Sequence, residues 1–155
     1  YKGGGSDLYH IRQCDSDINS FRGNGRFHEF DEDEPFFEHS DGGPYILKTN
    51  TNDEFANRVE PADQFKGDVA RIIAYIYIHY AKLGTLNQYT GSLSLTNVFP
   101  TFYDTKACQD LLVRWNEIDP PSNEEKDRND VVSCIQGNRN PFVDHPEYMG
   151  YCFGE

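Results

Sequence analysis

Apolar residues recur at helical spacing through one long segment, and this pattern predicts a helix from Pro61 to about Leu83. Proline suits the first helical position because its missing N–H has no partner there, and Gly84 suits the end. One apolar stripe follows the helical period; it is formed by Phe65, Val69, Ile72, Ile73, Ile76 and Tyr80. Neighbouring apolar residues widen the stripe, so we expect this helix to be central and buried on most sides.

Two further helices are predicted in the second half of the chain. The first runs from Thr105 to about Ile118, where consecutive prolines end it. Its inward face is formed by Leu111, Leu112 and Trp115. The second opens with the capping box Ser122-Asn-Glu-Glu125 and continues to Gln136. Its apolar side is formed by Val131, Val132 and Ile135.

The first half of the chain predicts smaller elements. A short helix covers Ile18–Arg22, with N-cap candidates at Asp15 and Asp17 and with Gly23 at its end. Weak strand candidates lie at residues 45–47 and 55–59, and residues 85–104 are loop-like. We therefore predict an α+β, mainly helical fold. It forms one domain over residues 1–155, with a long buried helix and a small strand and loop region.

The charge balance argues against a broad surface for nucleic acid. The chain carries 26 acidic and 14 basic residues, which gives a net charge of −12. Phosphate contacts rely on Lys and Arg, so this sign is wrong for long-range attraction of a polyanion. The plain interpretation is a solvated acidic surface. A basic or metal-bearing cleft would have to be local.

The cysteines and the hydrophobic runs limit the remaining classes. No apolar run approaches the roughly 18 residues of a membrane span, so we expect no membrane partner. The absence of CxxC spacing makes a zinc ribbon a poor interpretation. Disulfides and unpaired thiols both stay open for the four cysteines, which are Cys14, Cys108, Cys134 and Cys152.

The densest polar motif is Gln136-Gly-Asn-Arg-Asn-Pro-Phe-Val-Asp-His-Pro-Glu147. A core needs no such polar density, and a disordered tail would not carry Phe142 and Val143 beside two prolines. The motif predicts an ordered, specifically shaped loop, and loops of this kind often carry function.

This motif and four others occur in the order seen in the bacterial endonuclease I family of secreted or periplasmic non-specific nucleases. The family strings are similar to D-L-H-H/N, I/V-N-x-x-R-x-N, K/R-G-x-I/V-A-R, R-N/D and Q-G-N-x-N-P-F. The matching segments of this chain are Asp7–Arg12, Ile18–Asn24, Lys66–Arg71, Asp127–Asn129 and the run that begins at Gln136. The resemblance covers nearly the whole chain, and the last string is its most specific part.

The resemblance implies a ββα-metal (His-Me finger) nuclease that hydrolyses phosphodiester bonds of DNA, and also RNA as a further substrate. Its products would carry 5′-phosphate and 3′-hydroxyl ends. One divalent cation per site, Mg²⁺ with Ca²⁺ or Mn²⁺ as alternatives, would bind the scissile phosphate. By position, Asn19 corresponds to the metal-ligating Asn of the finger helix, and an amide oxygen suits a hard cation. The family also implies a secreted or periplasmic protein.

The chain departs from the family at its general base. The family's catalytic His lies upstream of the D-L-H-H segment, and the sequence given begins just before that segment. We expect an N-terminally incomplete chain, with a missing segment or a partner chain supplying the His. Two alternatives stay open: the chain could be a nuclease-fold module that binds without cutting, in a larger assembly, or His10 could act as a substitute base. Glu38-His39 is a weaker candidate, and Tyr9 replaces a residue that is usually His.

Further residues are predicted to bind substrate or to shape the site. Arg12 and Arg22 are candidates for phosphate contacts, with ordinary salt bridges as the equal alternative. Gln136, Asn138 and Asn140 are predicted to hydrogen-bond the loop backbone and so shape the site. A calcium-binding acidic surface at Asp31–Glu34 ranks last, because the run lacks the spacing of a calcium loop.

Overall fold

The computed structural model describes residues 7–23, 25–40, 42–43, 46–50, 58–82 and 105–154. Contacts gather the chain into two compact units. Residues 13–65 form the sheet unit, and residues 1–12 together with 66–155 form the helical unit. The fold is α+β and mainly helical, as predicted. A single domain over residues 1–155 stays a prediction.

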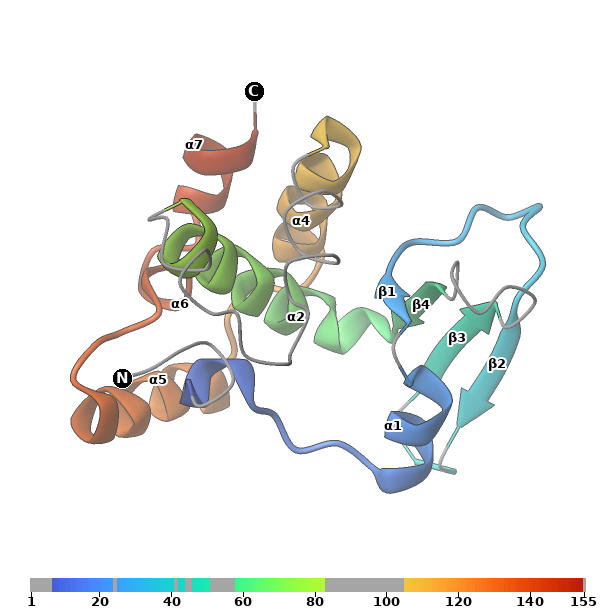
Figure 1. Cartoon of the computed structure of the whole chain (residues 1–155), viewed down its shortest axis with the longest axis horizontal. Coiled ribbons are helices and arrows are strands. Elements are labelled where there is room, and N and C mark those ends of the chain that lie inside the picture. The colour runs from blue at the N-terminus through green and yellow to red at the C-terminus, as the bar shows by residue number, and fades with distance from the viewer. Residues whose placement is uncertain are drawn as a thin grey trace. The chain divides into compact units, whose positions relative to one another are not determined.

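The sheet unit combines a short helix with a four-stranded sheet (Figure 1). The order is β1-β4-β3-β2, with β1 parallel to β4 and the other pairs antiparallel. Helix α1 (Ser16–Arg22) contacts β2 and β3, and its buried Ile18 packs against Leu47 and Val59. The strands of the described residues are β1 (Arg26–Phe27), β2 (Phe37–Ser40), β3 (Ile46–Asn50) and β4 (Arg58–Pro61).

Pro61 ends a strand, so the prediction that it opens the long helix was wrong. Pro61 is paired with Leu47 in the antiparallel β3–β4 ladder, and the N–H of Ala62 donates to the carbonyl of Ile46. The residue has no N–H to contribute to the ladder, and it occupies the last position of its strand. Helix α2 then begins at Asp63 and ends at Ile76.

The helical unit is built around α2, which continues as the π-helix η3 (Tyr77–Lys82). The N-terminal turn η2 (Leu8–His10) also belongs to this unit. The other helices are α4 (Lys106–Ile118), α5 (Asn123–Gln136), α6 (Pro141–Asp144) and α7 (Tyr148–Phe153). Helices α4 and α7 pack together (Figure 1). The largest fully buried apolar side chains are Trp115, Leu112 and Met149.

The burial of α2 on most sides is confirmed, although its buried face also contains charge. Ile73 and Ile76 of the predicted stripe are buried, and Phe65, Val69 and Ile72 are half-buried. Lys66 and Arg71 of the same helix are buried as well. The predicted end of the helix at Gly84, the loop at residues 85–104, the strand residues 45 and 55–57, and the side chain of Tyr80 lie outside the described residues.

Helices α4 and α5 start and end close to the predicted residues, but the capping box and the apolar side of α5 were partly wrong. The hydroxyl of Ser122 accepts from the N–H of Glu125 at 3.1 Å. The Glu125 carboxylate instead binds Arg71. Val132 is buried, whereas Val131 and Ile135 are 59% and 66% exposed. The helical spacing of apolar residues predicts which face of the helix they share. It does not predict whether another element covers that face.

Two findings concern the remaining predictions of chain class. The four cysteines all lie among the described residues, and none of them forms a disulfide. Cys108 is buried, and the other three are exposed. Within the described ranges, none of the helices has the length and apolar character needed to cross a membrane.

Candidate functional site

Asn19 is presented to solvent by a well-capped helix in the sheet unit. The Asp15 carboxylate caps α1 by accepting from the N–H of Asp17 at 2.8 Å and of Ile18 at 3.1 Å. Gly23 ends the helix with φ of 51°, a left-handed value that favours glycine. Because Ile18 faces the sheet, the adjacent Asn19 is exposed. Its side-chain amide has no hydrogen-bond partner among the described residues.

The chemistry of Asn19 fits one oxygen ligand of a hard cation. An unpaired amide oxygen can ligate Mg²⁺, which usually keeps several waters and takes further oxygens from substrate phosphates. The described residues contain no group of three His, Cys, Asp or Glu arranged to hold a metal. Asn19 therefore fits as a single protein ligand, and the other ligands would have to be water, phosphate or groups outside the described residues.

Arg22 lies one helical turn after Asn19 and so shares a face of α1 with it. Its guanidinium stacks over the Phe27 ring, with 5.1 Å between Cζ and the ring centroid. Its Nη1 donates to the Gly23 carbonyl at 3.3 Å. The guanidinium forms no salt bridge with any carboxylate in the described part of the chain, so the salt-bridge alternative for Arg22 is wrong there.

His39 is held by contacts of its own in the sheet unit. Its Nε2 lies 2.9 Å from Oγ1 of Thr49 on the neighbouring strand. The imidazole also stacks on Phe21 of α1, with 3.9 Å between centroids and 17° between planes. These contacts give His39 a structural role in joining α1 to the sheet.

In the helical unit, Asp7 anchors the N-terminal turn that carries His10. The Asp7 carboxylate is buried and accepts hydrogen bonds from the described residues Tyr9, Gln136 and Tyr75. Its Oδ1 accepts from the N–H of Tyr9 at 2.9 Å and from Nε2 of Gln136 at 3.0 Å. Its Oδ2 accepts from the hydroxyl of Tyr75 at 2.8 Å. One buried acid thus joins η2, α2 and the end of α5.

Gln136 and Asn138 extend this network. Oε1 of Gln136 accepts from the N–H of Leu8 at 2.8 Å, and Nδ2 of Asn138 donates to the Tyr75 hydroxyl at 2.6 Å. Nε2 of Gln136 also donates to Oδ1 of Asn138 at 3.0 Å. The sequence predicted that these side chains would bind loop backbone. The structure shows bonds to the Leu8 backbone and to the side chains of Asp7 and Tyr75.

Asn140 caps α6 and ties it to two other helices. Its Oδ1 accepts from the N–H of Phe142 at 3.0 Å, and its Nδ2 donates to the Arg71 carbonyl at 3.2 Å. Asn129 of α5 completes the link, because its Oδ1 accepts from the N–H of Asn140 and its Nδ2 donates to the Asn140 carbonyl. The backbone hydrogen bonding predicted for Asn140 is confirmed.

Tyr9 is a buried member of this network, which explains a tyrosine at this position. Its ring is 2% exposed and meets the Tyr75 ring edge-on, with 5.0 Å between centroids. Its hydroxyl is 2.8 Å from the Asn138 carbonyl and 3.2 Å from the Asn129 carbonyl. Burial raises the pKa of the hydroxyl, because an ionised phenol is poorly solvated there. Tyr9 therefore stays a neutral donor at physiological pH.

His10 ends the turn, and its imidazole is half-buried. No described residue offers the imidazole a hydrogen-bond partner. Arg12 follows and pairs with Asp68 of α2. The salt-bridge alternative is therefore confirmed for Arg12, although its side chain is still 35% exposed.

Arg71 makes a complete set of hydrogen bonds inside the helical unit. Its five N–H donors meet the Glu125 carboxylate at 2.9 and 2.6 Å, the Asn116 amide oxygen at 3.0 Å, the Asp119 carbonyl at 2.7 Å and Asp68 at 3.3 Å. Arg71 is fully buried, and Glu125 is 5% exposed. Burial outweighs the hydrogen bond and attraction from Arg71 and raises the pKa of Glu125 to about 7.

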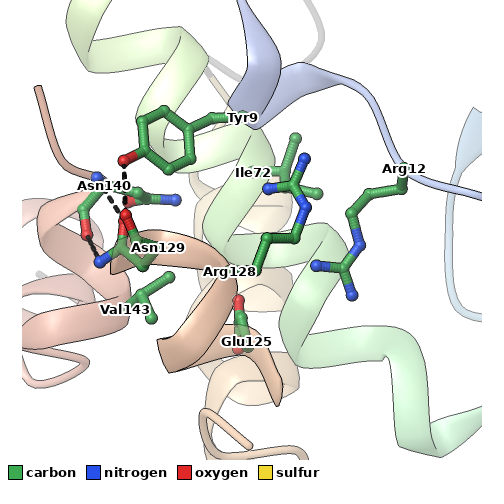
Figure 2. Close-up of a pocket in the computed structure, with 8 residues that line it drawn as sticks. All are labelled: Tyr9, Arg12, Ile72, Glu125, Arg128, Asn129, Asn140 and Val143. Carbon is green, nitrogen blue, oxygen red and sulfur yellow. Dashed lines mark hydrogen bonds between the residues drawn. The ribbon is translucent and has the colours of Figure 1, made fainter. Parts of the chain in front are cut away.

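A small pocket lies next to this ion pair (Figure 2). Its volume is about 10 Å³, which is about the room that one water molecule needs. Figure 2 shows the guanidinium groups of Arg12 and Arg128 on one side of the pocket and Tyr9 with Asn129 and Asn140 on the other. Arg128 lies in the matched string Asp127–Asn129, but the sequence analysis gave it no role in the site.

Replacing Tyr9 by Phe should lower the free energy of unfolding by about 1–2 kcal/mol, because the O–H that the Asn138 and Asn129 carbonyls share is lost while the ring packing stays. Urea unfolding followed by fluorescence of Trp115, the only tryptophan of the chain, would measure the change. Tyr151→Phe is the matched control, since Tyr151 is 82% exposed and should change stability by less than about 0.5 kcal/mol. Equal effects of the two substitutions would contradict the role given to the Tyr9 hydroxyl.

The family model for Endonuclease I matches residues 3–147 of this chain. The chain belongs to the Endonuclease I family. Extracellular ribonucleases of Bacillus subtilis (strain 168) and Bacillus amyloliquefaciens are each 36% identical to it, over 95% and 94% of the chain. The alignment covers 46% of each of these proteins, so this Endonuclease I chain spans about half the length of the curated relatives it matches.

The position of each predicted residue can be stated within its own unit. Asn19 and Arg22 share α1 in the sheet unit. The predicted residues of the helical unit are gathered around η2 and the end of α5; these are His10, Arg12, Gln136, Asn138 and Asn140. Sequence reasoning missed Asp7, Tyr75 and Asn129 as the residues that join them. The one available signal was the D-L-Y-H segment itself, whose Asp7 precedes the turn in the position of a helix cap.

Proposed function

We propose that this Endonuclease I chain takes part in divalent-metal-dependent hydrolysis of phosphodiester bonds in nucleic acid, with little sequence preference. The observation that carries the proposal is the exposed, unpaired amide of Asn19 on a capped helix, in a chain matched by the family model over residues 3–147. The name of the two Bacillus relatives, extracellular ribonuclease, supports RNA as a substrate. DNA is included in the proposal because the resemblance of the sequence motifs to the endonuclease I family implies it as a substrate.

The chain's own residues divide the work by their chemistry. Asn19 would hold a divalent cation, Mg²⁺ or otherwise Mn²⁺ or Ca²⁺, through its amide oxygen. Such a cation, when bound, stabilises the negative charge that develops on the phosphate and on the leaving oxygen. Arg22, one turn further along α1, would contact a substrate phosphate. The cleavage leaves 5′-phosphate and 3′-hydroxyl ends.

His10 is the described residue proposed as a substitute general base. Its imidazole has no hydrogen-bond partner among the described residues, so a ring nitrogen is available to accept a proton from the attacking water. The network around Asp7 would position it, with Gln136, Asn138 and Asn140 shaping the site. A histidine from a further segment or a partner chain is the alternative source of the base.

The names of the relatives also support a secreted protein.

A second candidate function is a nuclease-fold module that binds or has a structural role in a larger assembly without cutting. The net charge of −12 favours it, because an acidic surface weakens the capture of a polyanion. The two candidates differ in one observable, which is turnover.

Cleavage of labelled RNA and of plasmid DNA by the purified chain is the test. We expect cutting with Mg²⁺, its loss with EDTA, and a fall of about 100-fold or more in Asn19→Ala, since a metal ligand should matter at least as much as the groups that support one. Ser20→Ala is the matched control, because Ser20 is an exposed neighbour on α1. Its rate should stay within about twofold of the unaltered chain.

Direct metal binding separates the candidates further. Calorimetric titration with Mn²⁺ should show one site per chain, and Asn19→Ala should weaken it. Metal-independent cutting, or equal cutting by Asn19→Ala and Ser20→Ala, would refute the metal role of Asn19. Nucleic-acid binding with no turnover under any of these conditions would establish the module without activity.

A further inference from the structure

Arg128 has no acidic partner among the described residues of a strongly acidic chain. It forms no salt bridge with any carboxylate in the part of the chain that the structure describes. Other arginines of the helical unit are paired: Arg71 with Glu125, and Arg139 with Asp130 and Asp144. The sequence contains 26 acids, so a guanidinium of this unit without a bonded carboxylate is a candidate to bind an external anion.

The hydrogen bonds of Arg128 hold it in place while leaving donors unused. Its Nη2 donates to the carbonyl of Leu8 at 2.5 Å and of Ile11 at 2.6 Å. These bonds use the two hydrogens of Nη2 and leave those of Nη1 and Nε. Every buried side-chain nitrogen or oxygen among the described residues has a partner. The unbonded nitrogens of Arg128 are therefore not fully buried, and the residue as a whole is half-buried.

Arg12 adds a second guanidinium on the same side of the pocket (Figure 2). Burial, and after it the positive charge of Arg12, lowers the pKa of Arg128, although Tyr9, Asp68 and Glu125 oppose the effect. Two guanidinium groups of like charge thus lie near each other, and only Arg12 has a carboxylate bonded to it. An anion placed between them would relieve this repulsion and would complete the unused donors.

We propose that Arg128 and Arg12 together bind a phosphate group, and that in the working protein this is a phosphate of the nucleic-acid backbone. The assignment to nucleic acid rests on the proposed function. Oxygen-rich phosphate fits because each guanidinium presents several N–H donors in one plane. The pocket of about 10 Å³ is too small to enclose the group. The phosphate therefore sits at the solvent-facing rim, where Arg12 is 35% exposed.

Arg128 also connects this phosphate site to the turn of the proposed base. The two carbonyls that it binds belong to Leu8 and Ile11, which flank the last residues of η2, including His10. Holding a backbone phosphate at Arg128 would therefore fix the substrate against the segment that carries His10. This makes Arg128 a substrate-binding residue and, through the turn, a positioning residue.

The test is binding of a short fluorescent RNA oligonucleotide to the purified chain, measured by anisotropy in EDTA so that no cutting occurs. We expect Arg128→Gln and Arg12→Gln each to weaken binding about tenfold, as expected for the loss of a charge-assisted hydrogen bond to phosphate. The slope of log affinity against log salt should fall by about one unit in each. Arg128→Lys should recover part of the affinity, because it keeps the charge and loses the planar donors.

Lys126→Gln is the matched control for charge. Lys126 is exposed on the same helix as Arg128, and its removal changes the net charge by the same amount. Should Arg128→Gln and Arg12→Gln only match Lys126→Gln in affinity and in salt slope, the phosphate site is refuted. Circular dichroism of each variant checks the fold, and Arg12→Gln keeps the proposal testable if Arg128→Gln fails to fold, because Arg12 does not hold the turn.

Inorganic phosphate provides the second arm and separates this inference from the proposed function. If the unaltered chain cuts or binds nucleic acid but Arg12 and Arg128 prove dispensable, only the phosphate site fails. If the unaltered chain binds no nucleic acid, and phosphate raises its melting temperature but not that of Arg128→Gln, the phosphate site stands and its assignment to nucleic acid fails. The proposal is supported in full if Arg128→Gln loses both oligonucleotide binding and the rise in melting temperature with phosphate, while the unaltered chain shows both.

Discussion

Replacing Arg71 by Met is expected to lower the free energy of unfolding by about 3–5 kcal/mol, the usual cost of leaving one member of a buried ion pair without its partner. Arg71 is fully buried and Glu125 is 5% exposed. Methionine fills most of the volume of the arginine stem but donates no hydrogen bond. Both oxygens of the Glu125 carboxylate and the carbonyl of Asp119 would then lose donors at 2.6–2.9 Å.

The loss should depend on pH, and its sign follows from Glu125. Burial raises the pKa of Glu125 to about 7 in the folded protein, above the ordinary value of 4.5. A raised carboxyl pKa means that the folded state holds its proton more tightly than the unfolded state does, so this contribution to stability falls as pH rises from about 4.5 through 7. Without Arg71 the pKa should rise further, and Arg71→Met should be less destabilising at pH 5 than at pH 8.

Urea unfolding at pH 5 and pH 8, followed by Trp115 fluorescence, would measure both effects in the helical unit. The double variant Arg71→Met with Glu125→Leu is the control, because it removes the unpaired charge as well. Its stability should recover most of the loss and should show a weaker pH dependence than Arg71→Met. A loss of under about 1 kcal/mol in Arg71→Met, or no difference between the two pH values, would contradict this role of the ion pair.

Replacing Gly67 by Ala should destabilise the protein by about 3 kcal/mol, although Ala is the better helix former by about 1 kcal/mol. A Cβ at this position of α2 would meet the carbonyl oxygen of Asp119 at 1.8 Å and Nη1 of Arg71 at 2.7 Å. The nearest atom is backbone and cannot rotate away, so the end of α4 would have to move. That movement would also disturb the bond from Arg71 to the same carbonyl at 2.7 Å.

Gly150→Ala is the matched control for this prediction. Gly150 lies in α7, where a Cβ would meet nothing within 4 Å. Here the helix propensity acts alone, and the substitution should stabilise the protein by about 0.5–1 kcal/mol. The two glycine substitutions should therefore have opposite signs in the same urea experiment. A stabilising Gly67→Ala would mean that α2 and the end of α4 do not approach as closely as the structure shows.

Local chemistry made several elements predictable from the sequence. Asp15 and Gly23 mark the two ends of α1, and the structure has the cap and the left-handed glycine at those residues. The N-cap Ser122 and the C-cap Gly137 of α5 were equally predictable. These signals depend on backbone groups only a few residues away, so a linear reading captures them. Pro61 shows the limit of such predictions, because a proline can either open a helix or end a strand. Here Pro61 ends a strand because it pairs with Leu47 of β3.

Partners that lie far apart in the sequence could not be predicted in the same way. Asp7 meets Gln136, and Arg71 meets Glu125, across 129 and 54 residues. Glu125 was expected to close a capping box with Ser122, but a buried guanidinium is the stronger partner for its carboxylate in a low-dielectric interior. The pattern likewise placed Val131 and Ile135 on an apolar side, yet no described element covers them.

The sequence by itself determined the helices and caps of this chain, its mainly helical class, and its membership of the Endonuclease I family through short motifs whose residues are close together. The tertiary structure alone decided which charged groups are paired and which are left for a ligand. Family motifs pointed to Asn19 and to the string that contains Arg128, but they did not show whether these side chains have partners. Among the described residues, the fold supplies carboxylates to Arg71 and Arg139 and none to Arg128. Electrostatic partnership depends on distance in space, which the order of residues does not encode.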